Sequence, residues 1–159
     1  MAHELLSGLS PAEMDQVMAL GVRMIVPGGD SLFRLGDRAE SLFLIERGRV
    51  RLTLPMQVRS RESDVLIEEK SPGQTVGWSA LIPPYRFTLS ATASQETEVV
   101  ALSRQALQDY CEAFPAVGYK IALNLAIVVG HRLQMLQAMW LREMQRTIEG
   151  RSAWPAATR

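Results

Sequence analysis

Residues 72–93 decide the fold, and they read Pro-Gly-Gln-Thr-Val-Gly-Trp-Ser-Ala-Leu-Ile-Pro-Pro-Tyr-Arg-Phe-Thr-Leu-Ser-Ala-Thr-Ala. The segment begins with the turn signal Pro72-Gly73, tightens again at Gly77 and continues through the small pair Ser79-Ala80. Because glycine permits a positive φ and small side chains leave successive N–H groups open, such a segment is typical of the wall of an anion-binding pocket. Pro and Gly also mark ordinary turns of a β-barrel, so both interpretations stay open from this segment alone.

The sequence on both sides of this segment has the pattern of short strands. In Arg49–Leu54, apolar residues alternate with arginine and threonine, which predicts a strand with one buried and one solvated face. The predicted strands are Val22–Val26, Ser41–Ile45, Arg49–Leu54, Val65–Glu69 and Ser90–Leu102. The polar segment Met56–Asp64 is either a solvated hairpin tip or a flap that contacts a partner. Regular short strands separated by turns favour a jelly-roll barrel, a double-stranded β-helix, over residues 22–102.

Helices are predicted at both ends of this mainly β region. The sequence Ser10-Pro11-Ala12-Glu13 is a capping box with proline at the first helical position, and Ser103 is a candidate N-cap for a short helix ending near Phe114. A long helix is predicted over residues 116–145, on the order of 40 Å in length. We therefore expect one domain over residues 1–145 and a C-terminal tail over residues 146–159.

Three motifs in this chain resemble the cyclic-nucleotide-binding domain of the catabolite activator protein and fumarate-nitrate regulator families. They are Leu32-Phe33-x-x-Gly36-Asp37, Leu42-Phe43-Leu44-Ile45-x-x-Gly48 and Pro72-Gly73-x-x-Val76-Gly77. The resemblance extends over residues 10–145 and implies that residues 72–93 correspond to the family's phosphate-binding cassette. It also implies that the long helix forms a dimer.

The chain departs from the family pattern at the two charged anchors of the cassette. The family's glutamate, which holds the ribose, falls on Trp78, and its arginine, which pairs with the phosphate, falls on Phe87. Arg86 lies one position early, and it would need a bulge or a turn to reach the pocket, because neighbouring residues of an extended segment face opposite ways. Each lost charged contact is worth about 1.5–3 kcal/mol, so we expect cyclic AMP to bind weakly or not at all in the family's way.

The resemblance and the residues together give a set of candidate site residues. Leu136 stands where the family more often has a hydroxyl facing the purine. The candidate ligand is a cyclic nucleotide held in an altered way or another small anionic or apolar molecule. The predicted ligand-binding residues are Gly77, Trp78, Ser79, Ala80, Leu81, Arg86, Phe87, Thr88, Leu136 and Gln137.

The long helix carries more apolar surface than one small barrel can cover, so it needs a second partner. A parallel contact between two copies of the helix would supply one. The alternative is that the apolar stripe packs only on its own barrel. The residues predicted at the dimer interface are Ile121, Leu125, Val128, Arg132, Met135 and Met139.

Composition limits the functional classes. The formal net charge is zero, so no overall basic field attracts nucleic acid, and Thr147–Arg159 are too few residues for a helix-turn-helix domain. One cysteine, Cys111, fits a reducing cytoplasm, and no signal peptide or membrane span is evident. We therefore expect a cytoplasmic homodimer that contacts neither DNA nor a membrane directly.

No motif for catalysis or metal binding is evident, so we expect a non-enzyme without a metal site. The leading hypothesis is a small-molecule sensor that signals through its dimer helix to an unknown protein partner. The alternative is an interaction or scaffold module with a vestigial pocket. A third hypothesis, haem or redox sensing, depends only on Cys111 and His131.

Overall fold

The structure is a computed structural model that describes residues 2–152, and the side chain of Ser152 lies outside the description. The chain divides into two compact units, residues 1–125 and residues 126–159. The elements, in chain order, are η1 (Glu4–Leu6), α1 (Pro11–Ala19), β1 (Val22–Val26), β2 (Ser31–Phe33), β3 (Ser41–Arg47), β4 (Val50–Val58), β5 (Arg61–Lys70), β6 (Thr75–Val76), η2 (Trp78–Leu81), β7 (Ser90–Ala93), β8 (Thr97–Ser103), α2 (Arg104–Ala113) and α3 (Pro115–Ser152).

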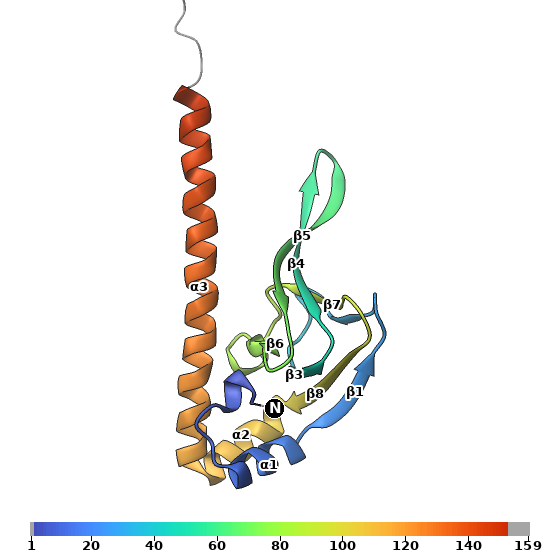
Figure 1. The fold of residues 1–159 in the computed structure, drawn as a ribbon, viewed down its shortest axis with the longest axis vertical. Helices are drawn as coiled ribbons and strands as arrows, with labels where there is room; N and C mark the ends of the chain where they lie inside the picture. Colours follow the sequence, from blue (N-terminus) through green and yellow to red (C-terminus); the bar gives the residue numbers. More distant parts are fainter. Residues whose placement is uncertain (1, 153–159) are drawn as a thin grey trace, which may run out of the picture. The chain divides into compact units, whose positions relative to one another are not determined.

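The first unit contains two four-stranded antiparallel sheets, with strand orders β1-β8-β3-β6 and β2-β7-β4-β5. The mainly β fold with flanking helices, a jelly roll, is therefore as predicted (Figure 1). The β4–β5 hairpin extends beyond the other strands of its sheet, and its turn lies at Arg59 and Ser60, which both have positive φ. The predicted strand Ser90–Leu102 is two strands, β7 and β8, because the chain turns between them.

The core of the first unit lies between the sheets and beneath the helices, where alternating strand residues are buried. In β8, Val99, Val100 and Leu102 have at most 1% of their surface exposed. Gly48 packs so closely on Thr97 that a Cβ atom would lie 2.4 Å from its hydroxyl oxygen, and its φ is +88°. No side chain larger than hydrogen fits there, which explains the glycine of the second motif.

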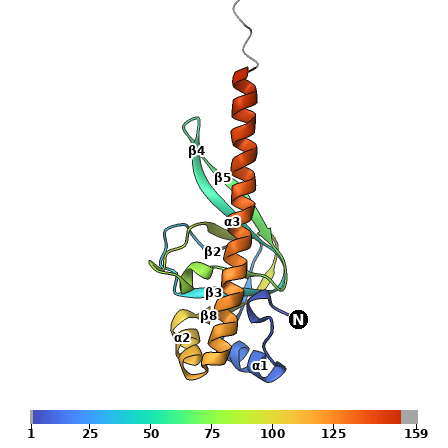
Figure 2. The ribbon, with the colours of Figure 1, turned by 90° about the vertical axis from the view of Figure 1, so that its left-hand side faces the viewer.

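The capping signals predicted from the sequence are present. The Ser10 side chain accepts the N–H of Glu13 and the Glu13 carboxylate accepts the N–H of Ser10, while Ser103 caps α2. Figure 2 shows α1 and α2 on either side of the first turns of α3. Asn124, on that part of α3, donates to the carbonyl oxygens of Leu5 and Ser7, which ties the N-terminal segment to the helix.

Helix α3 continues to Ser152, past the predicted end at residue 145. The side chains of Gln145 and Glu149 are hydrogen bonded, Arg146 pairs with Glu143, and the Thr147 hydroxyl donates to the carbonyl of Glu143. Such contacts three and four residues apart stabilise an exposed helix. The remainder of the predicted tail, residues 153–159, lies outside the described residues.

Candidate functional site

The cassette segment folds as a short helical turn that follows a left-handed glycine. Gly77 has a φ of +80°, and η2 begins directly after it. A Cβ atom at Gly77 would lie 3.1 Å from the Phe87 ring, 3.3 Å from Phe33 and 3.4 Å from Phe43. The backbone of the cassette therefore lies against a group of three aromatic rings.

Phe87 is the member of this group that stands at the arginine position of the resemblance. Its N–H donates to the carbonyl of Asp37 and its carbonyl accepts the N–H of Gly36, so both backbone groups are fixed to the loop after β2. The side chain is 7% exposed, and its ring stacks on Phe33 with centroids 3.7 Å apart and planes 11° apart. An aromatic ring in the core thus occupies the place where the resemblance expects a guanidinium.

Arg86 faces the opposite way and is exposed. Its Nη1 donates to the carbonyl oxygen of Gly36 at 2.9 Å. It forms a β-bridge with Arg38, so its backbone is extended and its side chain alternates with that of Phe87. The preceding residue, Tyr85, has a φ of +58° and lies under the Arg104 guanidinium, 4.0 Å from the ring centroid. The turn at Tyr85 therefore leaves Arg86 on the surface, with Phe87 inside.

The other predicted ligand residues differ in exposure. Ser79 and Ala80 are buried, Trp78 and Leu81 are half-buried, and Thr88 is exposed. Leu136 and Gln137 are exposed residues of the second unit. The cassette residues therefore form a largely closed wall around Gly77.

A small cavity opens beside the aromatic group. Its volume is about 250 Å³, and it is lined by Leu32, Phe33, Asp37, Arg38, Glu40, Ser41, Phe43 and Phe87. The wall of aromatic rings and the charged rim could take a small apolar group. Phe33 and Phe43 were absent from the predicted site, although both lie in the motifs that carry the resemblance.

Two of the dimer residues predicted on α3, Ile121 and Leu125, lie against the core of the first unit. Ile121 is 3% exposed in the core of the first unit, and Leu125 packs against that core. Val128, Arg132, Met135 and Met139 continue the same helical face into the second unit, since they follow at alternating steps of three and four residues.

A different heptad of α3 carries the exposed apolar side chains. It comprises Leu123, Ile127, Gly130, Gln134, Gln137, Leu141, Met144 and Ile148, and its five large apolar members are all exposed. Leu133 and Trp140 flank it and are also exposed. Counting heptads from Leu123 would have found this stripe, but only burial distinguishes it from the covered one.

The residues that could support redox or metal chemistry are not gathered into a site. Burial raises the pKa of the half-buried Cys111 thiol, which favours the less reactive protonated form. Across residues 2–152, no three His, Cys, Asp or Glu side chains come close enough together to hold a metal ion. In the same part of the chain, no helix has the length and hydropathy needed to cross a membrane.

Comparisons with known proteins identify relatives that contain a cyclic nucleotide-binding domain. The sequence model of the family described as "Cyclic nucleotide-binding domain" matches residues 23–114. The cyclic AMP receptor protein of Thermus thermophilus is 30% identical over 122 residues, which cover 77% of this chain and 55% of that protein. A Pycsar effector protein of Xanthomonas perforans is 26% identical over 125 residues, covering 78% and 39% of the two chains. The chain thus spans about half or less of the curated relatives it matches.

Solved structures give the same result. The crystal structure of the Thermus thermophilus catabolite activator protein superposes with a TM-score of 0.73 and 27% identity, covering 89% of this chain and 63% of that chain. A cyclic nucleotide-binding protein structure from Geobacter metallireducens superposes with a TM-score of 0.67 and 26% identity, covering 82% and 92% of the two chains.

Proposed function

The chain belongs to the family of cyclic nucleotide-binding domains, and we propose that it is a non-enzymatic regulatory domain that does not bind cyclic AMP in the family's way. In this proposal its output is self-association through the exposed stripe of α3, which presents the dimer to a protein partner. A cytoplasmic location, predicted from the single cysteine, is part of the same proposal.

The observation that carries the proposal is the stack of Phe87 on Phe33. A cyclic phosphate at this position would exchange water for apolar rings, and the cation that lines the adjacent cavity, Arg38, is an exposed residue. Burying an unpaired ionised group is strongly unfavourable. The phosphate would also have to separate an aromatic pair, which is worth about 0.5–1.5 kcal/mol beyond its buried area.

Titration calorimetry with cyclic AMP and cyclic GMP tests the first part of this proposal. The wild-type protein is expected to show no heat of binding at millimolar nucleotide. The double variant Trp78→Glu, Phe87→Arg restores the two charged groups of the resemblance and is expected to bind cyclic AMP, provided that circular dichroism shows it folded.

Arg86→Ala is the matched control, because Arg86 lies on the surface and contacts Gly36. Micromolar binding by the wild type that Arg86→Ala abolishes would contradict the proposal, since the arginine would then be reaching the pocket.

Light scattering after size exclusion tests the second part. A charge within the exposed stripe, Ile127→Glu, is expected to convert a dimer into a monomer, because a buried unpaired carboxylate opposes association. Arg142→Glu also places a carboxylate on an exposed position of α3, outside that heptad, and is expected to leave the dimer intact. A monomeric wild type would contradict the proposed output.

A second candidate is a sensor of a small apolar molecule, and the cavity beside Phe33, Phe43 and Phe87 favours it. Thermal unfolding with a panel of small apolar metabolites distinguishes the two. A ligand at about a hundred times its dissociation constant adds roughly 2.7 kcal/mol, which raises the midpoint by several degrees. A Phe43→Trp change that fills the cavity is expected to remove such a shift.

A further inference from the structure

A polar groove lies on the outer face of the sheet β2-β7-β4-β5, away from the stack of Phe87. The register of the strands establishes which side this is. Leu52 of β4 pairs with Ala91 of β7, and both are buried between the sheets. The next pair in register, Thr53 with Ser90, therefore points to the opposite face. Both of these residues line the groove.

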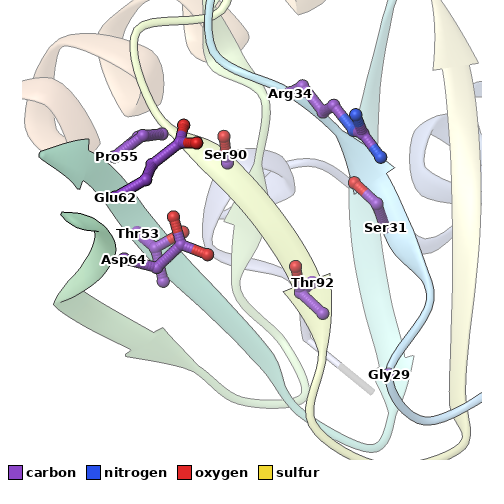
Figure 3. A pocket seen from close by; sticks show the side chains of 9 residues that line it. All are labelled: Gly29, Ser31, Arg34, Thr53, Pro55, Glu62, Asp64, Ser90 and Thr92. Atoms are coloured by element: carbon purple, nitrogen blue, oxygen red, sulfur yellow. The ribbon is translucent and has the colours of Figure 1, made fainter. Parts of the chain in front are cut away.

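The groove has a volume of about 510 Å³ and carries charges of both signs. Figure 3 shows the carboxylates of Glu62 and Asp64 on one side and the guanidinium of Arg34 on the other, with Ser90 and Thr92 between them. The acidic residues come from β5 and Arg34 from the end of β2, which are the two edges of the sheet. The groove thus crosses the sheet from edge to edge.

The charged groups of the groove have no partners within the described part of the chain. Among residues 2–152, the side chains of Arg34, Glu62 and Asp64 make no ion pair or hydrogen bond. Elsewhere on the same sheet, Arg49 and Glu69 pair at 2.9 Å. The groove is therefore a place where the sheet keeps charges of opposite sign apart.

Thr53 gives the groove a hydroxyl without a protein partner. The residue as a whole is 8% exposed, and within the described part of the chain its hydroxyl makes no hydrogen bond. The hydroxyl oxygen itself is not fully buried, so it can bond to a molecule in the groove. Since Thr53 lines the groove, a polar molecule in the groove would supply the missing partner.

We propose that this groove binds a small basic amino acid of the lysine or arginine type. Such a molecule has two cationic groups and one carboxylate, which complement Glu62, Asp64 and Arg34. The side-chain cationic group lies at the two acidic side chains, the α-carboxylate lies at Arg34, and the Thr53 hydroxyl donates or accepts a further hydrogen bond. Arg51, which pairs with Thr92 in register and faces the same side, disfavours a purely cationic ligand such as a polyamine.

Titration calorimetry on the whole chain tests this proposal with defined probes. L-lysine and L-arginine are the ligands, L-norleucine has the shape of lysine without the side-chain charge, and L-glutamate has the opposite charge. At least one basic amino acid is expected to bind at least about tenfold more tightly than norleucine, because one charged hydrogen bond contributes about that factor to affinity. Glutamate is expected not to bind. Equal binding of lysine and norleucine, or no binding of either basic amino acid, would overturn the proposal.

Variants then locate the site. Glu62→Gln and Asp64→Asn are each expected to weaken binding by about tenfold, and Thr53→Val by a smaller factor. Glu69→Gln is the matched control, because it removes the same charge from the same strand outside the groove. Loss of binding in Glu69→Gln equal to that in Glu62→Gln would overturn the assignment.

This inference is independent of the barrel interior. Phe87→Arg is expected to leave the affinity for lysine unchanged, since Phe87 lies on the inner side of the sheet. Cyclic nucleotide binding by the wild type would contradict the proposed function and leave this inference standing. An absence of amino acid binding would contradict this inference and leave the proposed function standing.

Discussion

On its inner face the sheet β2-β7-β4-β5 carries Phe33, Leu52 and Ala91, whereas Arg51, Thr53, Ser90 and Thr92 on its outer face are polar. The inner face is closed by stacked rings. The outer face keeps a hollow whose charges are unpaired among the described residues. Because alternate residues of one strand serve both faces, the same four strands close the family's usual pocket and open another surface.

The sharpest test of this contrast is truncation of one residue on each face. Phe87→Ala is expected to lower the free energy of unfolding by about 3–5 kcal/mol, because it removes a buried ring and leaves a cavity. Thermal denaturation would then show a midpoint lower by roughly 10 °C. Thr92→Ala on the outer face is expected to change the free energy by no more than about 0.5 kcal/mol. Similar losses for the two variants would contradict the description of a closed interior.

Two of the buried threonines of the barrel, Thr97 and Thr53, allow a comparison of hydroxyl groups. The Thr97 hydroxyl oxygen lies 2.8 Å from the carbonyl oxygen of Gln95 and accepts the N–H of Arg49 at 3.2 Å. Thr97→Val is expected to cost about 1–3 kcal/mol because it leaves these groups unpaired. Thr53→Val is expected to be neutral or stabilising, because no described group loses a partner. Urea denaturation measures both, and a comparable loss for Thr53→Val would mean that its hydroxyl is satisfied within the protein.

Two glycines with positive φ allow the effect of backbone conformation on stability to be distinguished from the effect of side-chain packing. Gly36 has a φ of +89° with nothing within 4 Å of the position that a Cβ atom would take, whereas Gly77 has a φ of +80° with aromatic carbons from 3.1 Å. Gly36→Ala is expected to cost about 1–2 kcal/mol for the left-handed conformation alone. Gly77→Ala is expected to cost more, since Phe87 and its neighbours must also move. Equal losses in the free energy of unfolding for the two variants, measured by denaturant titration, would mean that the aromatic rings move without an energetic cost.

The sequence predicted those parts of the fold that local rules determine. The capping box at Ser10, the strand Val22–Val26 and the inward side of Phe87 follow from local spacing and alternation. The surface position of Arg86 follows from the same alternation, whereas its hydrogen bond to the carbonyl of Gly36 joins distant segments and no local pattern reveals it. The outer groove draws on four strands, so only the assembled sheet brings its charges together.

The exposed stripe of α3 shows a related limit of prediction from the sequence. Two heptads on the same helix are apolar enough to form a seam, and the sequence favoured the one that contains Ile121. Ile121 is buried in the core of the first unit, whereas Ile127 is exposed. Periodicity alone therefore cannot assign a helix face to a core or to an interface.

The smallest expected effect concerns a buried polar group at the N-terminal end, His3. Burial lowers the pKa of its imidazole below the ordinary value of 6.5, against the opposing attraction of Glu46. The side chain is 4% exposed, and its Nδ1 has no hydrogen-bond partner among the described residues. The native state therefore favours the neutral ring, while the unfolded chain takes up a proton at the ordinary pKa.

The sign of the pH dependence follows from this difference. The contribution of His3 to stability is complete above the ordinary pKa and is lost as the pH falls below it, because the unfolded state binds the proton first. Thermal midpoints measured from about pH 7.5 to about pH 5.5 should therefore fall more steeply for the wild type than for His3→Gln, which cannot titrate. Parallel curves for the wild type and His3→Gln would show that the imidazole exchanges its proton as freely as an exposed one, and would place His3 with the solvated groups.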